Sequence, residues 1–150
     1  MNRRRQIQLS PEEQTAFFRK HRKAALATID KKGFPHLVAM NFFAKDGAFY
    51  MTSYGKAQKV VNIRRNPRVA LMIEEGNGYS ELRGVMVRGH CEIVEGADAV
   101  RAAFAEMAQA RGTTPSRPQA AGDSAPKRVV LKIIAEKITS WDHSKLGGIY

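Results

Sequence analysis

The chain has 150 residues, of which 43% are hydrophobic, enough for a single compact domain with its own core over residues 1–150. No apolar run is long enough to span a bilayer, and the basic N-terminus is not followed by the apolar stretch of a signal peptide. We therefore expect a cytoplasmic protein without a membrane partner. The single cysteine, Cys91, excludes an internal disulfide and a cysteine-based metal site.

The formal net charge of +11 fits a protein that meets nucleic acid, an anionic membrane or phosphorylated small molecules. The basic residues are spread over residues 3–5, 19–23, 56–68 and 127–132, without an aromatic RNA-binding pattern, a Cys/His finger or a clear helix-turn-helix. We read most of these charges as solvated surface, which makes nucleic acid an unlikely partner. Only residues 56–65 have the local pattern of a binding site.

The first predicted element is a helix that begins at Ser10. The hydroxyl of Ser10 can cap the helix, Pro11 suits its first position, and Glu13 completes a capping box. We expect this helix to turn Phe17 and Phe18 inward and to end in the basic run at residues 19–23.

The remaining pattern is mostly short strands joined by turns. Turn residues lie at 30–33, 45–47 and 76–78, a second long helix is expected at residues 97–111, and residues 112–126 read as a mobile loop. The expected strands cover residues 24–29, 36–44, 48–53, 68–74, 79–94 and 129–134, and the last one could extend towards residue 141. Gly84 and Gly89 indicate bends or bulges in the fifth of them.

This order of elements predicts an α+β fold that is mainly β: an antiparallel barrel, closed or nearly closed, with helices at the periphery. The first three strands are joined by turns that are too short for the crossovers of a parallel sheet.

One segment, residues 49–69, has the pattern of a phosphate site. A strand ends in Thr52 and Ser53, the chain turns at Gly55, and a short helix follows that carries Lys56 and Lys59 in its first turn. Hydroxyls, lysines and the positive end of a helix dipole then meet at one place, which favours a phosphorylated ligand. Lys59 has the best case as phosphate ligand, whereas Thr52 and Ser53 could equally cap the helix and Lys56 could be solvated.

Other candidate residues have plainer explanations. The four histidines do not form a spaced metal set, so structural or surface roles are favoured for them. Trp141 reads as a core anchor more than as a stacking platform. Arg65 or Arg68 could pair with Glu74 or Glu75. The sequence shows no catalytic triad and no paired carboxylates, so no protein residue is predicted to be catalytic, which fits redox chemistry by a bound cofactor.

The ordered set of these segments resembles the pyridoxamine 5'-phosphate oxidase-like family of flavin-binding split β-barrels. The ending at residues 140–143 is similar to the closing strand of a branch that often uses the deazaflavin coenzyme F420 instead of FMN. The segments that carry the likeness are residues 25–29, 33–36, 52–53, 59–69, 83–89 and 140–143.

The resemblance implies a homodimer with cofactor sites between the subunits and a hydride-transfer role for the cofactor. Lys59 would bind its phosphate, Thr52 and Ser53 would supply hydroxyls, and Asn62 would brace the turn. The strand at residues 38–41, with Ala39, Met40 and Asn41, would lie against the flavin ring. Many relatives have a bulky residue where Asn41 stands, so the substrate stays open.

The leading hypothesis is therefore an oxidoreductase that uses F420 or FMN, with a slight preference for F420, to reduce a small conjugated or carbonyl-type molecule. Two alternatives remain. The first is a non-enzymatic flavin- or haem-binding protein on the same barrel. The second is a basic nucleic-acid-binding domain, which would bind more weakly as salt rises.

Overall fold

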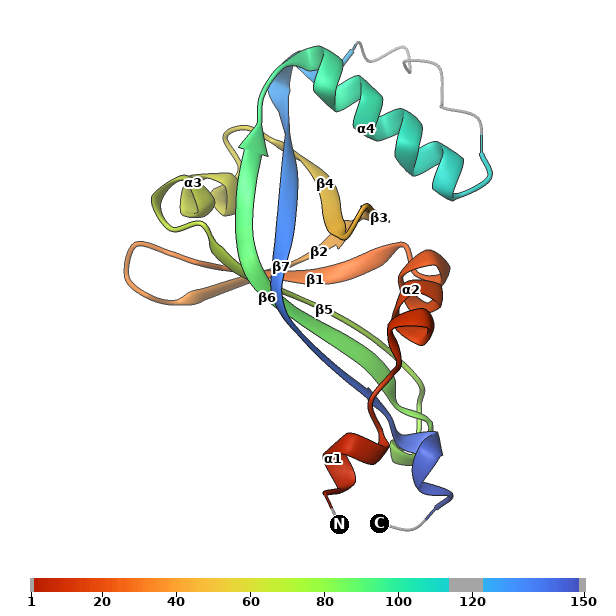
Figure 1. The fold of residues 1–150 in the computed structure, drawn as a ribbon. Helices are drawn as coiled ribbons and strands as arrows, with labels where there is room; N and C mark the ends of the chain where they lie inside the picture. The colour runs from red at the N-terminus through yellow and green to blue at the C-terminus, as the bar shows by residue number, and fades with distance from the viewer. Residues whose placement is uncertain (1, 114–122, 149–150) are drawn as a thin grey trace.

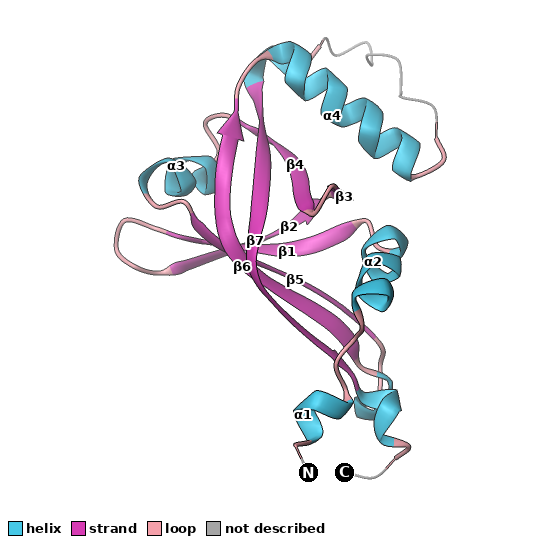
Figure 2. Cartoon of the chain, viewed as in Figure 1, coloured by secondary structure: helices cyan, strands magenta, loops and turns pink. Residues whose placement is uncertain are grey.

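The computed structural model describes residues 2–113 and 123–148, and its strands form one antiparallel, seven-stranded sheet in the order β2-β1-β5-β6-β7-β4-β3 (Figure 1). Figure 2 shows that strands dominate the chain and that the helices lie around them, as the sequence predicts for a split barrel. The strands are β1 (Lys23–Ile29), β2 (Pro35–Asn41), β3 (Phe43–Lys45), β4 (Ala48–Tyr54), β5 (Arg68–Glu75), β6 (Arg83–Val94) and β7 (Arg128–Asp142).

The described helices are α1 (Arg3–Gln6), α2 (Pro11–Lys20), α3 (Gln58–Arg65) and α4 (Ala97–Ala110). Short 3-10 turns cover Tyr79–Glu81, Ala125–Lys127 and His143–Leu146. Among the described residues, no helix has the length and apolar character needed to cross a membrane. Most of the loop predicted at residues 112–126 lies outside the described residues.

The start of α2 confirms the predicted capping box. The Ser10 hydroxyl accepts from the backbone N–H of Glu13 at 3.2 Å, and the Glu13 carboxylate accepts from the Ser10 N–H at 2.7 Å. Phe17 is buried and Phe18 packs partly buried against the main core, which holds α2 against the sheet as predicted.

The single strand predicted at residues 36–44 is split into β2 and β3 at Phe42. The Phe42 N–H donates to the Arg22 carbonyl at 3.0 Å, and its side chain enters the main core. Phe43 is also buried, but it belongs to a second apolar cluster under α4. Two consecutive buried residues break the alternation of a strand, and the chain turns a corner of the barrel there.

Strand β7 joins the two parts of the sheet. Its first half pairs with all of β4, from Arg128 opposite Tyr54 to Ile134 opposite Ala48, while β7 also pairs with β6 along its length. The register of β6 against β7 shifts between Arg88 and Gly89, which confirms the bulge predicted at that glycine.

The main core lies inside the curved sheet and includes residues of α3. Val60 and Ile63 from α3 pack there with strand residues such as Leu26 and Leu131. Cys91 belongs to the same core, and burial raises the pKa of its thiol to about 12, so the thiol stays protonated and unreactive.

Replacing Gly89 by alanine should destabilise the fold by about 2 kcal/mol, because a Cβ at this position would overlap the backbone carbonyl of Ile134. Urea unfolding would measure the change. Gly55→Ala is the matched control, since its Cβ would meet Lys127 and Val129 atoms at an ordinary 3.7 Å. Equal stability of the two variants would contradict this account of the bulge.

Candidate functional site

The turn from β4 into α3 leaves the N-terminus of α3 without a protein cap. Ala57 occupies the N-cap position, makes no side-chain cap, and no acidic residue lies in the first helical turn. The first backbone N–H groups of an α-helix have no partner within the helix, so here they are available to an outside acceptor. Together with the helix dipole they favour an anion at this end.

Lys59 lies in this first turn and faces the end of β4. Its ammonium nitrogen donates to the Ser53 hydroxyl oxygen at 3.2 Å. Burial, and after it the positive charge of Arg128, lowers the pKa of Lys59 below its ordinary value. All 14 Asp and Glu residues lie in the described part of the chain, and none of them pairs with Lys59 there.

Lys56 lies in the turn before α3, not in the first helical turn where the sequence placed it. The helix begins two residues later, at Gln58. The Lys56 side chain is exposed. It can therefore approach a ligand at the helix end only from the solvent side.

The hydroxyls of Thr52 and Ser53 point to opposite faces of the sheet. Ser53 is opposite Val129, a main-core residue, and its face is the one that Lys59 meets. Thr52 is opposite Val130, which belongs to the cluster under α4. Of the two predicted hydroxyls, the structure therefore brings only Ser53 together with Lys59.

Asn62 holds α3 against the sheet. It is fully buried, its side-chain amide N–H donates to the Thr28 hydroxyl at 3.0 Å, and its amide oxygen accepts from Gln58 at 2.8 Å. Because a buried amide needs these partners, the bonds fix how α3 sits on β1. The resemblance implies that Asn62 braces the turn, whereas the bonds seen here join it to Thr28 of β1 and to Gln58 of α3.

The strand predicted to flank a ring, β2, is an edge strand, so within the described part of the chain one side of its backbone has no neighbouring strand. Ala39 and Asn41 are exposed, whereas the side chain of Met40 is buried in the main core. A ring beside β2 could therefore meet the side chains of Ala39 and Asn41, but only the backbone of Met40.

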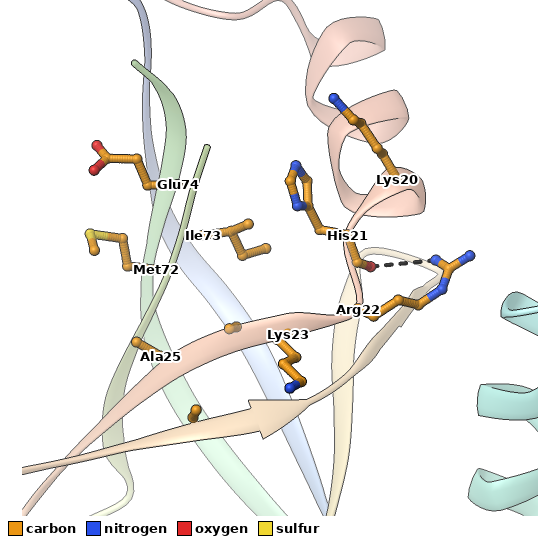
Figure 3. A pocket seen from close by; sticks show the side chains of 10 residues that line it. Lys20, His21, Arg22, Lys23, Ala25, Met72, Ile73 and Glu74 are labelled. Carbon is orange, nitrogen blue, oxygen red and sulfur yellow. Dashed lines mark hydrogen bonds between the residues drawn. The ribbon is translucent and has the colours of Figure 1, made fainter. Parts of the chain in front are cut away.

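A hollow of about 550 Å³ lies beside β2, at the end of β1 that is remote from α3 (Figure 3). Its wall includes Ala39, and Figure 3 shows Ala25 near Met72 and Glu74 on one side and His21 and Lys23 on the other. Of the predicted site residues, this hollow includes Ala39 but none of the phosphate candidates.

The arginines near α3 behave differently from what we expected. Arg65 donates to the backbone carbonyl of Ile29, and Arg64 pairs with Glu95 at 2.6 Å. Neither Arg65 nor Arg68 pairs with Glu74 or Glu75, because Glu75 is taken by Lys20 at 2.8 Å and Glu74 by the Trp141 indole at 2.9 Å. The predicted pairing was wrong.

Residues 140–143, which carried the likeness to the F420 branch, make contacts within the chain. The Ser140 hydroxyl accepts from the Leu9 N–H at 3.0 Å, Trp141 donates to Glu74, and the His143 ring packs against Tyr79 at 4.4 Å between centroids. These bonds tie the end of β7 to the N-terminal segment and to the end of β5, which gives this segment a structural role.

Arg128, the first residue of β7, was not among the predicted site residues. It lies opposite Tyr54 in the sheet, and its positive charge adds to burial in lowering the pKa of Lys59. No local motif marks it, because it reaches the site only through the pairing of β7 with β4. Within the described residues, no group of His, Cys, Asp or Glu is arranged to hold a metal ion.

Comparison with known proteins supports the family resemblance. The model of the pyridoxamine 5'-phosphate oxidase family matches residues 10–142. A conserved hypothetical protein from Mycobacterium tuberculosis is 35% identical and has a TM-score of 0.85, and the match covers 97% of this chain and 92% of that one. No curated protein matches the chain.

Two more distant structures share the fold. An F420 reductase is 24% identical with a TM-score of 0.67, and the match covers 82% of this chain and 93% of that one. An FAD-binding protein from Mesorhizobium loti is also 24% identical with a TM-score of 0.67, over 88% and 94% of the two chains.

Replacing Asn62 by alanine should lower the free energy of unfolding by about 2 kcal/mol, because it leaves the buried Thr28 hydroxyl without its donor and opens a gap under α3. Urea denaturation would measure this change. Gln58→Ala removes only the exposed partner of Asn62 and should cost less than about 1 kcal/mol. If Asn62→Ala is no less stable than Gln58→Ala, Asn62 is not the brace of α3.

Proposed function

The chain belongs to the pyridoxamine 5'-phosphate oxidase family, and we propose that it is an oxidoreductase that binds F420 or FMN. In this proposal a hydride passes between the cofactor and a small conjugated or carbonyl-type acceptor. The observation that carries the proposal is the uncapped N-terminus of α3, where Lys59 faces Ser53 without a carboxylate partner among the described residues.

The phosphate of the cofactor fits the N-terminus of α3. The free N–H groups there would take the place of the missing cap, and the Lys59 ammonium would add a full positive charge. The Ser53 hydroxyl accepts from Lys59 and donates to the Tyr54 carbonyl at 3.3 Å, and it would exchange the second of these bonds for one to a phosphate oxygen.

The separation between α3 and the predicted ring strand suits a long cofactor. Asn62 of α3 bonds to Thr28, and Ala25, which pairs with Ala39 of β2, lies three residues from Thr28 along β1. At roughly 3.3 Å per residue, Ala25 and its partner Ala39 lie about 10 Å along the strands from Thr28, to which α3 is anchored. A flavin, whose phosphate and ring are joined by a flexible chain, can span that separation. The unpaired backbone of β2 could then bond to the polar edge of the ring.

The chain's own residues would bind, orient and shelter the cofactor. A bound flavin or deazaflavin supplies the hydride chemistry, which needs no protein nucleophile. Lys59 and the end of α3 would hold one end in place, while β2 would fix the plane of the ring. The small Ala39 side chain leaves room for a substrate beside it, and the hollow at Ala39 is a place where such a substrate could lie.

The choice between F420 and FMN is part of the proposal. The F420 reductase and the FAD-binding protein share the fold with this chain and support a deazaflavin and a flavin equally. The slight preference for F420 rests on the likeness at residues 83–89 and 140–143.

We also propose that the partner is a second copy of the chain, seated on the outer face of β2, β1 and β5. Leu37 and Met72 are 66% and 43% exposed on this face, which is unusual for large apolar side chains. Small residues lie beside Leu37 and Met72 on the neighbouring strands. Across the three strands, one row of paired residues is Leu37, Ala27 and Ala70, and the other is Ala39, Ala25 and Met72. A second copy there would cover the hollow beside Ala39 and exclude water from the ring.

Replacing Lys59 by alanine should weaken binding of the preferred cofactor about tenfold or more, because a charge-assisted contact to phosphate is lost. Fluorescence titration of the wild type and the variant with FMN and with F420 would measure this. Lys31→Ala, which removes an exposed turn lysine, is the matched control and should leave affinity within about twofold.

The same titrations separate the alternatives. Binding of haem or of a flavin without turnover of any acceptor would favour a storage protein. The nucleic-acid hypothesis would be favoured if the protein binds no cofactor but binds nucleic acid with an affinity that falls steeply with salt and is unchanged in Lys59→Ala. Equal cofactor affinity of the wild type and Lys59→Ala would overturn the proposed phosphate site.

Leu37→Glu should convert the proposed dimer to a monomer, because it places a charge in the centre of an apolar interface. Light scattering coupled to size-exclusion chromatography would measure the mass, and the wild type should have twice the monomer mass. Val94→Glu is the control, since Val94 is 39% exposed but lies at the far end of β6. A monomeric wild type would contradict the interface.

A further inference from the structure

Arg128 lies beside the proposed phosphate site although it comes from the other end of the chain. It is the first residue of β7 and pairs with Tyr54, the last residue of β4. The neighbouring turn is closed by the Gly55 N–H, which donates to the Lys127 carbonyl at 3.0 Å. Arg128 is therefore fixed at the point where the chain leaves the sheet for α3.

The guanidinium of Arg128 is held by aromatic rings and not by a carboxylate. Its central carbon lies 4.0 Å from the centre of the Tyr54 ring and 5.8 Å from that of Phe104 in α4. Its Nε atom is buried and meets no acceptor in residues 2–113 and 123–148. Aromatic faces orient a guanidinium, but they leave its positive charge and its N–H donors available.

Lys59 and Arg128 flank the end of β4 from its two faces: Lys59 meets Ser53, whereas Arg128 meets Tyr54 and Phe104 of α4. The positive charge of Arg128 adds to burial in lowering the pKa of Lys59. Some cations of the chain are neutralised by carboxylates, such as Lys45 by Glu106 at 2.6 Å and Lys145 by Glu13 at 2.7 Å, whereas Lys59 and Arg128 are among the many that are not. No ion pair neutralises Lys59 or Arg128, although every acidic residue of the chain is described. Two neighbouring positive charges that no carboxylate neutralises repel each other, and a bound anion would relieve this repulsion.

We propose that Arg128 is the second cation of the α3 site and takes the second negative charge of the ligand's anionic end. The ligand would lie across the end of β4, where Ser53 faces Lys59 on one side and Tyr54 carries Arg128 on the other. Two chemistries supply such an end: a phosphomonoester dianion, as in FMN, or a phosphodiester with a neighbouring carboxylate, as in F420. This inference rests on the proposed function, since it concerns the same site.

The test compares FMN with riboflavin, which has the same ring but no phosphate, by fluorescence titration. The ratio of the two affinities measures what the phosphate contributes, and a titration with F420 runs in parallel. Arg128→Met keeps an apolar stem against Tyr54 and Phe104 and removes the charge, while Arg128→Lys keeps a charge. Lys127→Met is the matched control, because it removes an exposed charge from the adjacent residue.

We expect Arg128→Met to lower the ratio of FMN to riboflavin affinity about tenfold or more, and Lys127→Met to leave it within about twofold. Arg128→Lys should recover most of the loss. If Arg128→Met loses affinity for F420 alone, the ligand's anionic end is the phosphodiester with its carboxylate. If it loses affinity for FMN alone, the anionic end is the phosphomonoester. If Arg128→Met does not fold, Arg128→Gln takes its place.

An unchanged ratio in Arg128→Met, together with a loss in Lys59→Ala, would overturn this inference and leave the proposed function intact. Arg128→Lys that binds as weakly as Arg128→Met would also overturn the role of the charge. A wild type that binds neither cofactor would refute the proposed function. In that case the protein would be titrated with inorganic pyrophosphate and followed by NMR. A shift of the Arg128 Nε–H signal would support the two-cation site, and the absence of a shift would overturn it.

Discussion

The pairing of β7 with both β4 and β6 is the constraint on which the rest of the structure depends. The single strand β7 (Arg128–Asp142) is hydrogen-bonded to β4 on one side and to β6 on the other. It therefore prevents the part of the sheet with β4 from moving away from the part with β5 and β6. The bulge at Gly89 lets β6 follow this strand without a clash. The same pairing places Arg128 opposite Tyr54, so the proposed site depends on the register of the sheet.

A second constraint positions α3 on this frame. The buried bond between Asn62 and Thr28 and the packing of Val60 and Ile63 fix the helix, so its uncapped first turn points to a defined place. Lys59 is then held at Ser53 in partly buried surroundings, where a charge interacts more strongly than in water. Sheet, helix and cations together make a rigid anion site, and a rigid site suits a cofactor whose ring must be placed accurately.

Much of this could be predicted from the sequence where the signal is local. The capping box at Ser10, the hairpin at Asp46 and Gly47 and the bulge at Gly89 are each encoded by a few neighbouring residues. The alternation of side chains between the two faces of a strand is a further local signal. Adjacent residues such as Thr52 and Ser53 must point to opposite faces, and the consecutive Phe42 and Phe43 signal a break.

What could not be predicted depends on long-range contacts. Arg128 has no motif around it, and its place beside Tyr54 at the end of β4 follows only from the register of β7. The pairing of Glu75 with Lys20 displaced the expected arginine partners for the same reason. Exposure of Leu37 and Met72 likewise becomes visible only when the sheet is assembled, because a strand's apolar face can belong to a core or to an interface.

The most direct test of the central claim is a crystal structure of the protein with whichever of FMN and F420 binds more tightly. The account predicts the phosphate at the N-terminus of α3, within hydrogen-bond distance of Lys59, and the ring along β2 at Ala39. A cofactor whose phosphate lies elsewhere, for example in the hollow beside His21 and Lys23, would contradict it.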